Sequence, residues 1–223
     1  MKKTMLMTPG PTEVHRKVRR ALSARAGNPD LDPKFFRFYK ETADRFKELF
    51  DTRSQVLILD GEGLLGLEAA CATLIEPGDR VLCIDNGLYG RGFGDFVRMY
   101  GGEPVFFEGD YREAIDPAAL ADFLKQDSGF KAATLVHCET PSGIRNPVDR
   151  IGPLLKEYGI LSIVDTVSAV GGEEFHGDDW GLDVVLAGSQ KCLSAPPGLS
   201  IVSVSDAAWE KVDARRAPIA SFY

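Results

Sequence analysis

Short apolar runs alternate with amphipathic segments along most of this chain. Seven runs of four to six residues are rich in aliphatic side chains and predict buried strands; they cover residues 55–59, 80–84, 104–107, 132–137, 160–164, 184–187 and 199–204. The other segments predict helices over residues 17–25, 33–50, 64–75, 92–100, 117–125, 153–158 and 206–215. Such alternation is typical of α/β proteins, so we expect a seven-stranded, mostly parallel sheet with helices on both faces.

The first residues do not fit this alternation. The Pro-Gly-Pro of residues 9–11 opposes a helix, so we expect an extended arm over residues 1–16 and one domain over residues 17–223. The helix predicted at 33–50 carries an aromatic stripe, which is more typical of a core or a subunit contact than of a ligand site.

Composition excludes several classes of partner. The chain has a net charge of −7, so we expect it to bind neither nucleic acid nor an anionic membrane. No apolar run approaches the length that spans a bilayer. The four cysteines are not spaced as a disulfide framework, and no His, Cys and acid residues have metal-ligand spacing. We therefore expect no metal, and a reducing, cytoplasmic location.

Lys191 follows the apolar run 184–187, at the point where a buried strand is predicted to end. Lysine is strongly hydrated and is rarely buried without a partner or a chemical role. Loss of hydration disfavours an ammonium group and leaves a nucleophilic amine. The alternative is a surface lysine that begins a loop.

Asp165 follows the apolar run 160–164, at another predicted strand end. Ligands of open α/β sheets bind beyond the carboxyl ends of the strands, so we expect Asp165 and Lys191 to meet at one edge. Pyridoxal 5′-phosphate (PLP) requires this pair, because a lysine holds its aldehyde and an acid keeps its ring nitrogen protonated. The pair therefore favours PLP as the cofactor.

Four ordered motifs, at residues 8–12, 163–168, 188–191 and 195–198, resemble the class V aminotransferases (alanine–glyoxylate and serine–pyruvate type) of PLP fold type I. The resemblance covers nearly the whole chain. It implies the large domain of that fold, a homodimer with active sites at the interface, and a Schiff base on Lys191. It also implies transfer of an amino group from a small amino acid, such as alanine or serine, to a small 2-oxo acid, such as glyoxylate or pyruvate.

The resemblance further assigns contacts to the cofactor. They are the phosphate cradle Glu62, Gly63 and Leu64, the ring-stacking Tyr89, the hydroxyl of Thr140, the ring acid Asp165, Val167 behind the ring, Gln190 toward the phosphate, and Lys191. Glu62 departs from the family, which usually has Ser or Thr in this cradle. Because a carboxylate repels a phosphate, we expect its side chain to turn away so that only the backbone contributes.

Other functions compete with this one. The Gly-x-Gly-x-x-Gly of residues 61–66 follows a predicted strand, and Asp85 ends the next strand about 20 residues on, which imitates the dinucleotide-binding fingerprint of an oxidoreductase. The related cysteine desulfurases usually carry histidines where this chain has Gln190 and Tyr89, so the resemblance favours transamination over desulfuration.

Members of the resembled family continue past the position of Tyr223 with a small C-terminal domain. That domain carries an arginine that grips the substrate carboxylate, and no arginine here matches it. We therefore expect the large domain alone, as a fragment, the product of a split gene or a truncated chain. A non-catalytic remnant that only binds PLP is a further alternative, and the sequence does not name the amino donor or acceptor.

Overall fold

A seven-stranded sheet forms the centre of the computed structural model, which describes residues 5–25 and 27–221. The strands stand in the order β1-β9-β8-β7-β4-β2-β3; their bounds are β1 Gln55–Asp60, β2 Arg80–Asp85, β3 Glu103–Glu108, β4 Ala132–Val136, β7 Leu161–Asp165, β8 Val184–Gly188 and β9 Leu199–Val204. β9 pairs antiparallel with both of its neighbours, and the other pairs of this sheet are parallel. The predicted α/β fold with a mostly parallel sheet is therefore confirmed.

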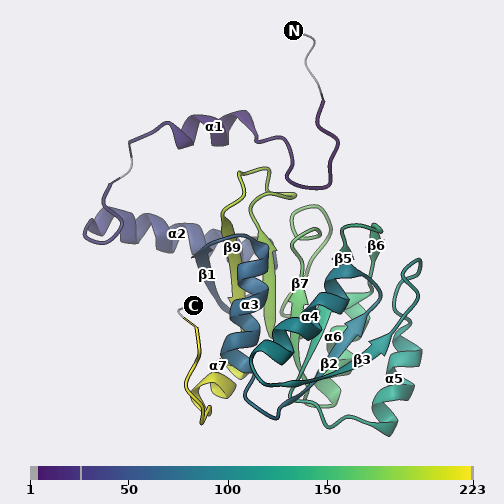
Figure 1. The fold of residues 1–223 in the computed structure, drawn as a ribbon. Coiled ribbons are helices and arrows are strands. Elements are labelled where there is room, and N and C mark those ends of the chain that lie inside the picture. The colour runs from purple at the N-terminus through teal and green to yellow at the C-terminus, as the bar shows by residue number, and fades with distance from the viewer. Residues whose placement is uncertain (1–4, 26, 222–223) are drawn as a thin grey trace.

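Helices cover both faces of the sheet (Figure 1). Their bounds are α1 Arg16–Leu22, α2 Pro33–Phe50, α3 Gly63–Leu74, α4 Leu88–Met99, α5 Pro117–Gln126, α6 Val148–Glu157 and α7 Asp206–Asp213. One apolar layer contains Phe50, Leu124 and Leu155 from α2, α5 and α6, and the opposite layer contains Leu67, Phe93 and Ala208 from α3, α4 and α7. Within the described part of the chain, no helix has both the length and the apolar character needed to cross a bilayer.

The starts of α2 and α5 follow local signals in the sequence. The side chains of Asp32 and Asp116 accept the backbone N–H groups of Lys34 and Ala118, and a proline occupies the first turn in both helices. An acidic cap followed by proline satisfies a free N–H group and sets the helical φ angle in advance. These two helices therefore begin where their sequences predict.

Two predicted helices have wrong starts. α4 begins at Leu88 instead of residue 92, and α6 begins at Val148 instead of residue 153. α6 continues through Pro153, although proline lacks the N–H of one helical hydrogen bond. Burial of the apolar side of α6 against the sheet outweighs that loss. α4 starts early because a distant side chain caps it, as described below.

A short hairpin follows β4 and was not predicted. Its strands, β5 (Cys138–Glu139) and β6 (Ile144–Arg145), pair antiparallel. Gly143 lies in the turn with a φ of 73°, a conformation that favours glycine. The hairpin reverses the chain at Thr140, close to the carboxyl end of β4.

The N-terminal arm and α1 lie apart from the helices that cover the sheet (Figure 1). α1 is shorter than the helix predicted over 17–25, and none of its residues is buried. Residues 1–4 and 222–223, at the outer ends of the predicted arm and domain, lie outside the described residues.

Candidate active site

A cavity of about 220 Å³ lies at the carboxyl edge of the parallel strands. Its lining residues are Gly10, Pro11, Glu62, Gly63, Leu64, Leu67, Tyr89, Thr140, Asp165, Val167, Ser168, Gln190 and Lys191. All nine residues that the sequence predicts for a cofactor site are among them. Parallel strands explain this convergence, because the segments after β1, β2, β4, β7 and β8 all emerge at the same edge. The contacts of each residue with a cofactor remain predictions.

Lys191 is part of the cavity wall, with 8 % of the residue exposed. Its Nζ lies 3.5 Å from Thr140 Oγ1. No carboxylate among the described residues forms an ion pair with this amine. A buried lysine without an anionic partner is costly, so its presence here indicates a chemical role.

The turn after β8 holds Lys191 in place. Ser189 Oγ donates to the Pro196 carbonyl at 2.6 Å and accepts the Leu199 N–H at 3.2 Å. The Ser194 N–H donates to the Lys191 carbonyl at 3.0 Å. Ser194 has a φ of 52°, a left-handed conformation that is costly for serine. Such conformations persist where the surrounding contacts hold them, and they cluster at functional sites.

Asp165 ends β7 and lines the same cavity, with 5 % of the residue exposed. Its Oδ1 accepts the Val167 N–H at 2.8 Å. Burial raises the pKa of Asp165 to about 6, although this hydrogen bond and the charge of Lys191 lower it in part. No basic side chain in the described chain forms an ion pair with Asp165, so its carboxyl group is available to a protonated ring nitrogen.

Tyr89 is positioned by a carboxylate from a distant part of the chain. The buried Glu139 accepts the N–H groups of Tyr89 at 3.2 Å and Gly90 at 2.6 Å. A negative charge at this end of a helix also complements the helix dipole. α4 therefore starts at Leu88, and its first turn brings the half-buried Tyr89 to the cavity.

Two hydroxyl groups lie beside the lysine amine. Thr140 Oγ1 is 2.5 Å from Ser168 Oγ and 3.5 Å from Lys191 Nζ. Thr140 comes from the β5–β6 turn, and Ser168 comes from the loop after β7. The amine and the two hydroxyls therefore form a short chain of polar atoms along the cavity wall.

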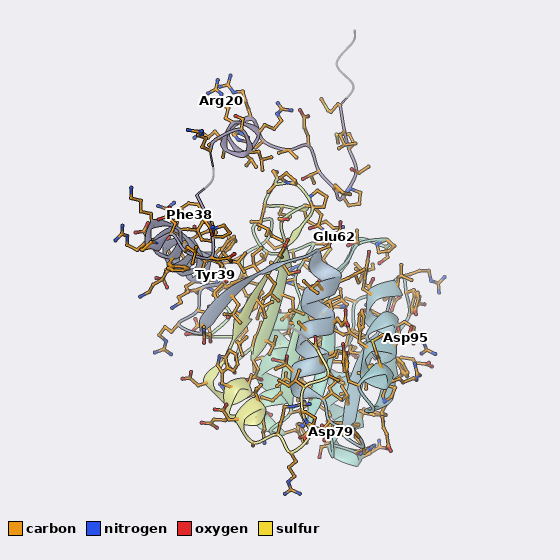
Figure 2. The ribbon with its side chains drawn as sticks, turned by 60° about the vertical axis from the view of Figure 1, so that its left-hand side comes forward. Arg20, Phe38, Tyr39, Glu62, Asp79 and Asp95 are labelled. Carbon is orange, nitrogen blue, oxygen red and sulfur yellow. The ribbon has the colours of Figure 1, made fainter. Side chains whose placement is uncertain are left out.

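The N-terminus of α3 borders the cavity, and no side chain caps it. The first N–H groups of a helix have no partner within the helix and attract anions. A Cβ on the buried Gly63 would lie 2.8 Å from Val167 Cγ2, so this close approach requires glycine. Figure 2 shows Glu62 at this end of α3, and its exposed carboxylate has no partner within the described residues. Its orientation toward or away from a phosphate remains a prediction.

The chemistry of the cavity lining matches the pyridine ring of PLP, and it accepts the phosphate group only when the Glu62 side chain turns aside. A buried amine, a buried acid and an aromatic ring match the needs of the pyridine ring. Gln190 Oε1 is buried without a hydrogen-bond partner in the described chain, so this oxygen can accept a hydrogen bond from a ligand. Among the residues that the structure describes, the lining holds no basic side chain apart from Lys191, and Glu62 adds a negative charge. A phosphate fits at α3 when the Glu62 side chain turns aside.

Four lining residues were not assigned to the cofactor site from sequence: Gly10, Pro11, Leu67 and Ser168. Leu67 could have been found from the sequence, because it lies one helical turn after the predicted site residues Gly63 and Leu64. Ser168 closes one of the family motifs. Gly10 and Pro11 belong to another motif, but the sequence does not show where the arm runs.

The dinucleotide-binding alternative does not fit this sheet. In dinucleotide-binding folds the glycine-rich turn follows a central parallel strand. Here residues 61–66 follow β1, which lies at the edge of the sheet and pairs antiparallel with β9. Asp85, the candidate ribose ligand, is buried and pairs with Arg91 at 3.0 Å. We therefore reject this alternative.

Known proteins are similar to this chain in both sequence and fold. The family model described as aminotransferase class V matches residues 8–216. Pyridoxamine–pyruvate transaminase from Mesorhizobium japonicum is 42 % identical over 208 residues, which are 93 % of this chain and 53 % of that protein. The chain spans about half the length of the curated relatives it matches.

Two solved structures show the same arrangement of elements. Pyridoxamine–pyruvate aminotransferase from Mesorhizobium loti has a TM-score of 0.92 at 39 % identity, over 99 % of this chain and 56 % of that one. Alanine–glyoxylate aminotransferase from Nostoc sp. has a TM-score of 0.94 at 31 % identity, over 100 % of this chain and 59 % of that one.

Proposed function

Because the chain belongs to the class V aminotransferase family and has the large-domain fold of PLP fold type I, we propose that it moves an amino group from a small amino acid to a small 2-oxo acid. Class V aminotransferases are PLP-dependent enzymes. Alanine or serine is the proposed donor, and glyoxylate or pyruvate the proposed acceptor. One observation carries the proposal: Lys191 and Asp165 are both buried at one cavity, and neither forms an ion pair in the described chain.

When bound, PLP supplies an aldehyde that takes up the amino group and a protonated ring that accepts electron density. Lys191 would bind the aldehyde and, once the substrate amine displaces it, would carry a proton to and from carbon as general base. Asp165 would hold the proton on the ring nitrogen, because an adjacent cation favours the ionised carboxylate. Thr140 would keep the freed amine within reach, since its hydroxyl lies 3.5 Å from Nζ.

The remaining lining residues would hold the cofactor. Tyr89 would stack on the ring, and Val167 would pack behind it. The N–H groups of Gly63 and Leu64 would bind the phosphate at the start of α3. Gln190 would reach the phosphate through its amide N–H₂, with its carbonyl oxygen accepting a donor from the ligand.

We further propose that the protein is a homodimer and that it lies in a reducing, cytoplasmic compartment. Large apolar side chains are exposed on the arm and around α1 and α2, as expected of a subunit contact: Met5, Leu6, Met7, Leu22, Leu31, Phe36 and Phe38. The four cysteines carry free thiols, and two of them are fully buried. The division into an arm over 1–16 and a domain over 17–223 is also proposed; α1 opens that domain, although none of its residues is buried.

A single-turnover assay tests the amino transfer. The chain is loaded with PLP and mixed with L-alanine or L-serine, and the released 2-oxo acid and pyridoxamine 5′-phosphate are quantified by mass spectrometry. We expect both products from the parent chain and neither from Lys191→Ala. A loaded parent chain that releases neither product would contradict the proposal and favour a chain that only binds PLP.

Glu62 favours a second candidate function, in which the phosphate-free vitamin is the amino donor. A carboxylate about 4 Å from one phosphate charge costs about 1–4 kcal/mol, depending on the local dielectric constant. Pyridoxamine and pyridoxal carry a hydroxymethyl group in place of the phosphate and avoid this cost. The relative with 42 % identity is a pyridoxamine–pyruvate transaminase. In this candidate the ring compound enters and leaves as a substrate, and pyruvate takes its amino group.

Substitution of Glu62 tests this second candidate. Alanine formation from pyruvate is measured with pyridoxamine and with pyridoxamine 5′-phosphate as donors. We expect the parent chain to prefer pyridoxamine, and Glu62→Ser to shift the kcat/KM ratio at least about ten-fold toward the phosphate form, since ten-fold corresponds to about 1.4 kcal/mol. Asp60→Ser removes an exposed charge outside the lining and should leave the ratio unchanged. A parent chain that prefers pyridoxamine 5′-phosphate would exclude the second candidate, and an unchanged ratio in Glu62→Ser would remove the support that Glu62 gives it.

A further inference from the structure

The arm touches the side chain of Lys191 at Gly10. A Cβ built on Gly10 would lie 2.1 Å from Lys191 Cδ, 2.7 Å from Cε and 3.0 Å from Nζ. Non-bonded carbon atoms pack at about 3.5–4.0 Å, so only glycine allows this approach. The arm therefore contacts the outer part of the lysine side chain, while Thr140 contacts its amine.

Hydrogen bonds fasten the arm to the turn that carries the lysine. The Thr12 N–H donates to the Gln190 carbonyl at 2.9 Å, and Thr12 Oγ1 donates to the Lys191 carbonyl at 2.8 Å. The His15 N–H donates to the Ser194 carbonyl at 3.0 Å. Thr12, two residues after Gly10, is thus bonded through its hydroxyl to the backbone of Lys191 and through its N–H to that of Gln190.

We propose that Gly10 is a positioning residue that sets the place of the Lys191 amine, with Thr12 holding the arm against it. The atoms that a side chain at position 10 would meet belong to the flexible end of Lys191 and not to the backbone. An alanine there therefore displaces the amine and leaves the arm folded. The effect on turnover rests on the proposed function, but the place of the amine is a property of the chain alone.

Reductive methylation with ¹³C-formaldehyde reports on this amine without a cofactor. The full chain, Gly10→Ala and Gly92→Ala are labelled, and Lys191→Arg identifies the resonance of Lys191. Gly92 is the matched control, because a Cβ there would meet nothing within 4 Å. We expect the Lys191 resonance to shift in Gly10→Ala and to stay in place in Gly92→Ala. A Gly10→Ala spectrum that matches the parent would overturn the proposal.

The role of Thr12 is tested by the rate of the same labelling. In Thr12→Val the hydroxyl bond to the turn is lost, and a hydrogen bond contributes about 1 kcal/mol, so we expect the labelling of Lys191 to accelerate up to about five-fold. Thr12→Ser keeps the hydroxyl and should restore the parent rate. Equal rates in Thr12→Val and Thr12→Ser would show that this hydroxyl does not hold the arm.

Turnover gives a second, separate readout. A reacting group misplaced by about 1 Å costs up to about 100-fold in rate, so kcat should fall between about ten-fold and 100-fold in Gly10→Ala while the KM for the 2-oxo acid changes little. If the loaded parent chain shows no turnover, the proposed function fails and the methylation spectra still decide the role of Gly10. If turnover is present and Gly10→Ala equals Gly92→Ala in kcat and in spectrum, the positioning role is overturned.

Discussion

At the scale of single residues, the cavity holds two buried groups of opposite charge that do not pair with each other. Asp165 accepts a backbone N–H, and Lys191 lies next to a hydroxyl. Burying a charge without an ion-pair partner costs several kcal/mol, so this arrangement lowers the stability of the free chain. Such groups are typical of ligand sites, where the ligand supplies the missing partner.

The pH dependence of stability tests the burial of Asp165. Its folded pKa is raised to about 6, so between about pH 4 and 6 the folded state keeps a proton that the unfolded state has released. Stability therefore falls as the pH rises through this range. Asp165→Asn removes this loss, and we expect the unfolding free energy of the variant to gain about 2–3 kcal/mol on the parent between pH 4 and pH 7.

Urea unfolding of both proteins without cofactor, at several pH values, measures this difference. His137 titrates in the same range with the opposite sign, because burial lowers its pKa to about 4, but it is common to both proteins and cancels. A difference between parent and variant that stays constant from pH 4 to pH 7 would contradict the burial of an unpaired Asp165.

At the scale of elements, the first turn of α4 depends on the β5–β6 hairpin. Glu139 of β5 accepts two N–H groups at the start of α4, and this contact brings Tyr89 to the cavity. Burial raises the pKa of Glu139, while the two N–H donors lower it. The charged form at a helix N-terminus is the stabilising one.

Replacement of Glu139 by glutamine tests this contact. Hydrogen bonds to a charged group contribute about 1.5–3 kcal/mol, so we expect Glu139→Gln to lower the unfolding free energy by about 1–3 kcal/mol at pH 7. Glu108→Gln is the control, because Glu108 is exposed and its ion pair with Arg91 lies at the surface, where such pairs contribute little to stability. Equal urea midpoints for the two variants would show that Glu139 does not support α4.

The elements that the sequence predicts well are those with local causes. The strands are short apolar runs, and α2 begins at an aspartate followed by proline. The early start of α4 could not be predicted, because its cap Glu139 lies about 50 residues further along the chain. Asp165 and Lys191 were predictable from their places at strand ends, since parallel strands bring such residues to one edge, whereas the other seven site residues were predicted only through the family resemblance. The contact of Gly10 with Lys191 was not, because the bonds of Thr12 and His15 that place the arm all end on backbone carbonyls of the Lys191 turn, which leave no pattern in the sequence.

At the scale of the whole molecule, apolar side chains gather outside the sheet on the arm, α1 and α2. Tyr39 of α2 bonds to the N–H and the carbonyl of Ile58, which ties this helix to β1 (Figure 2). The neighbouring Phe38 is 63 % exposed, and Phe36 is 52 % exposed. Exposed aromatic residues beside such an anchor are typical of a surface that another subunit covers.

The oligomeric state tests that surface. We expect the parent chain to sediment as a dimer, and Phe38→Glu to shift it to the monomer, because a charge buried in an apolar contact costs several kcal/mol. Lys40→Glu changes an exposed charge on the same helix and serves as the control. Analytical ultracentrifugation decides, and a parent chain that is monomeric at all concentrations would contradict the homodimer.

Covalent trapping of the ring on Lys191 is the most direct measurement of the site. The chain is incubated with PLP or pyridoxal, reduced with borohydride, and digested for peptide mass mapping. We predict that the pyridoxyl mass is found on Lys191 at about one per chain, and that Lys191→Arg takes up none at low ligand concentration. Label spread evenly over surface lysines, with Lys191 unmodified, would show that the lysine and Asp165 do not face one pyridine ring.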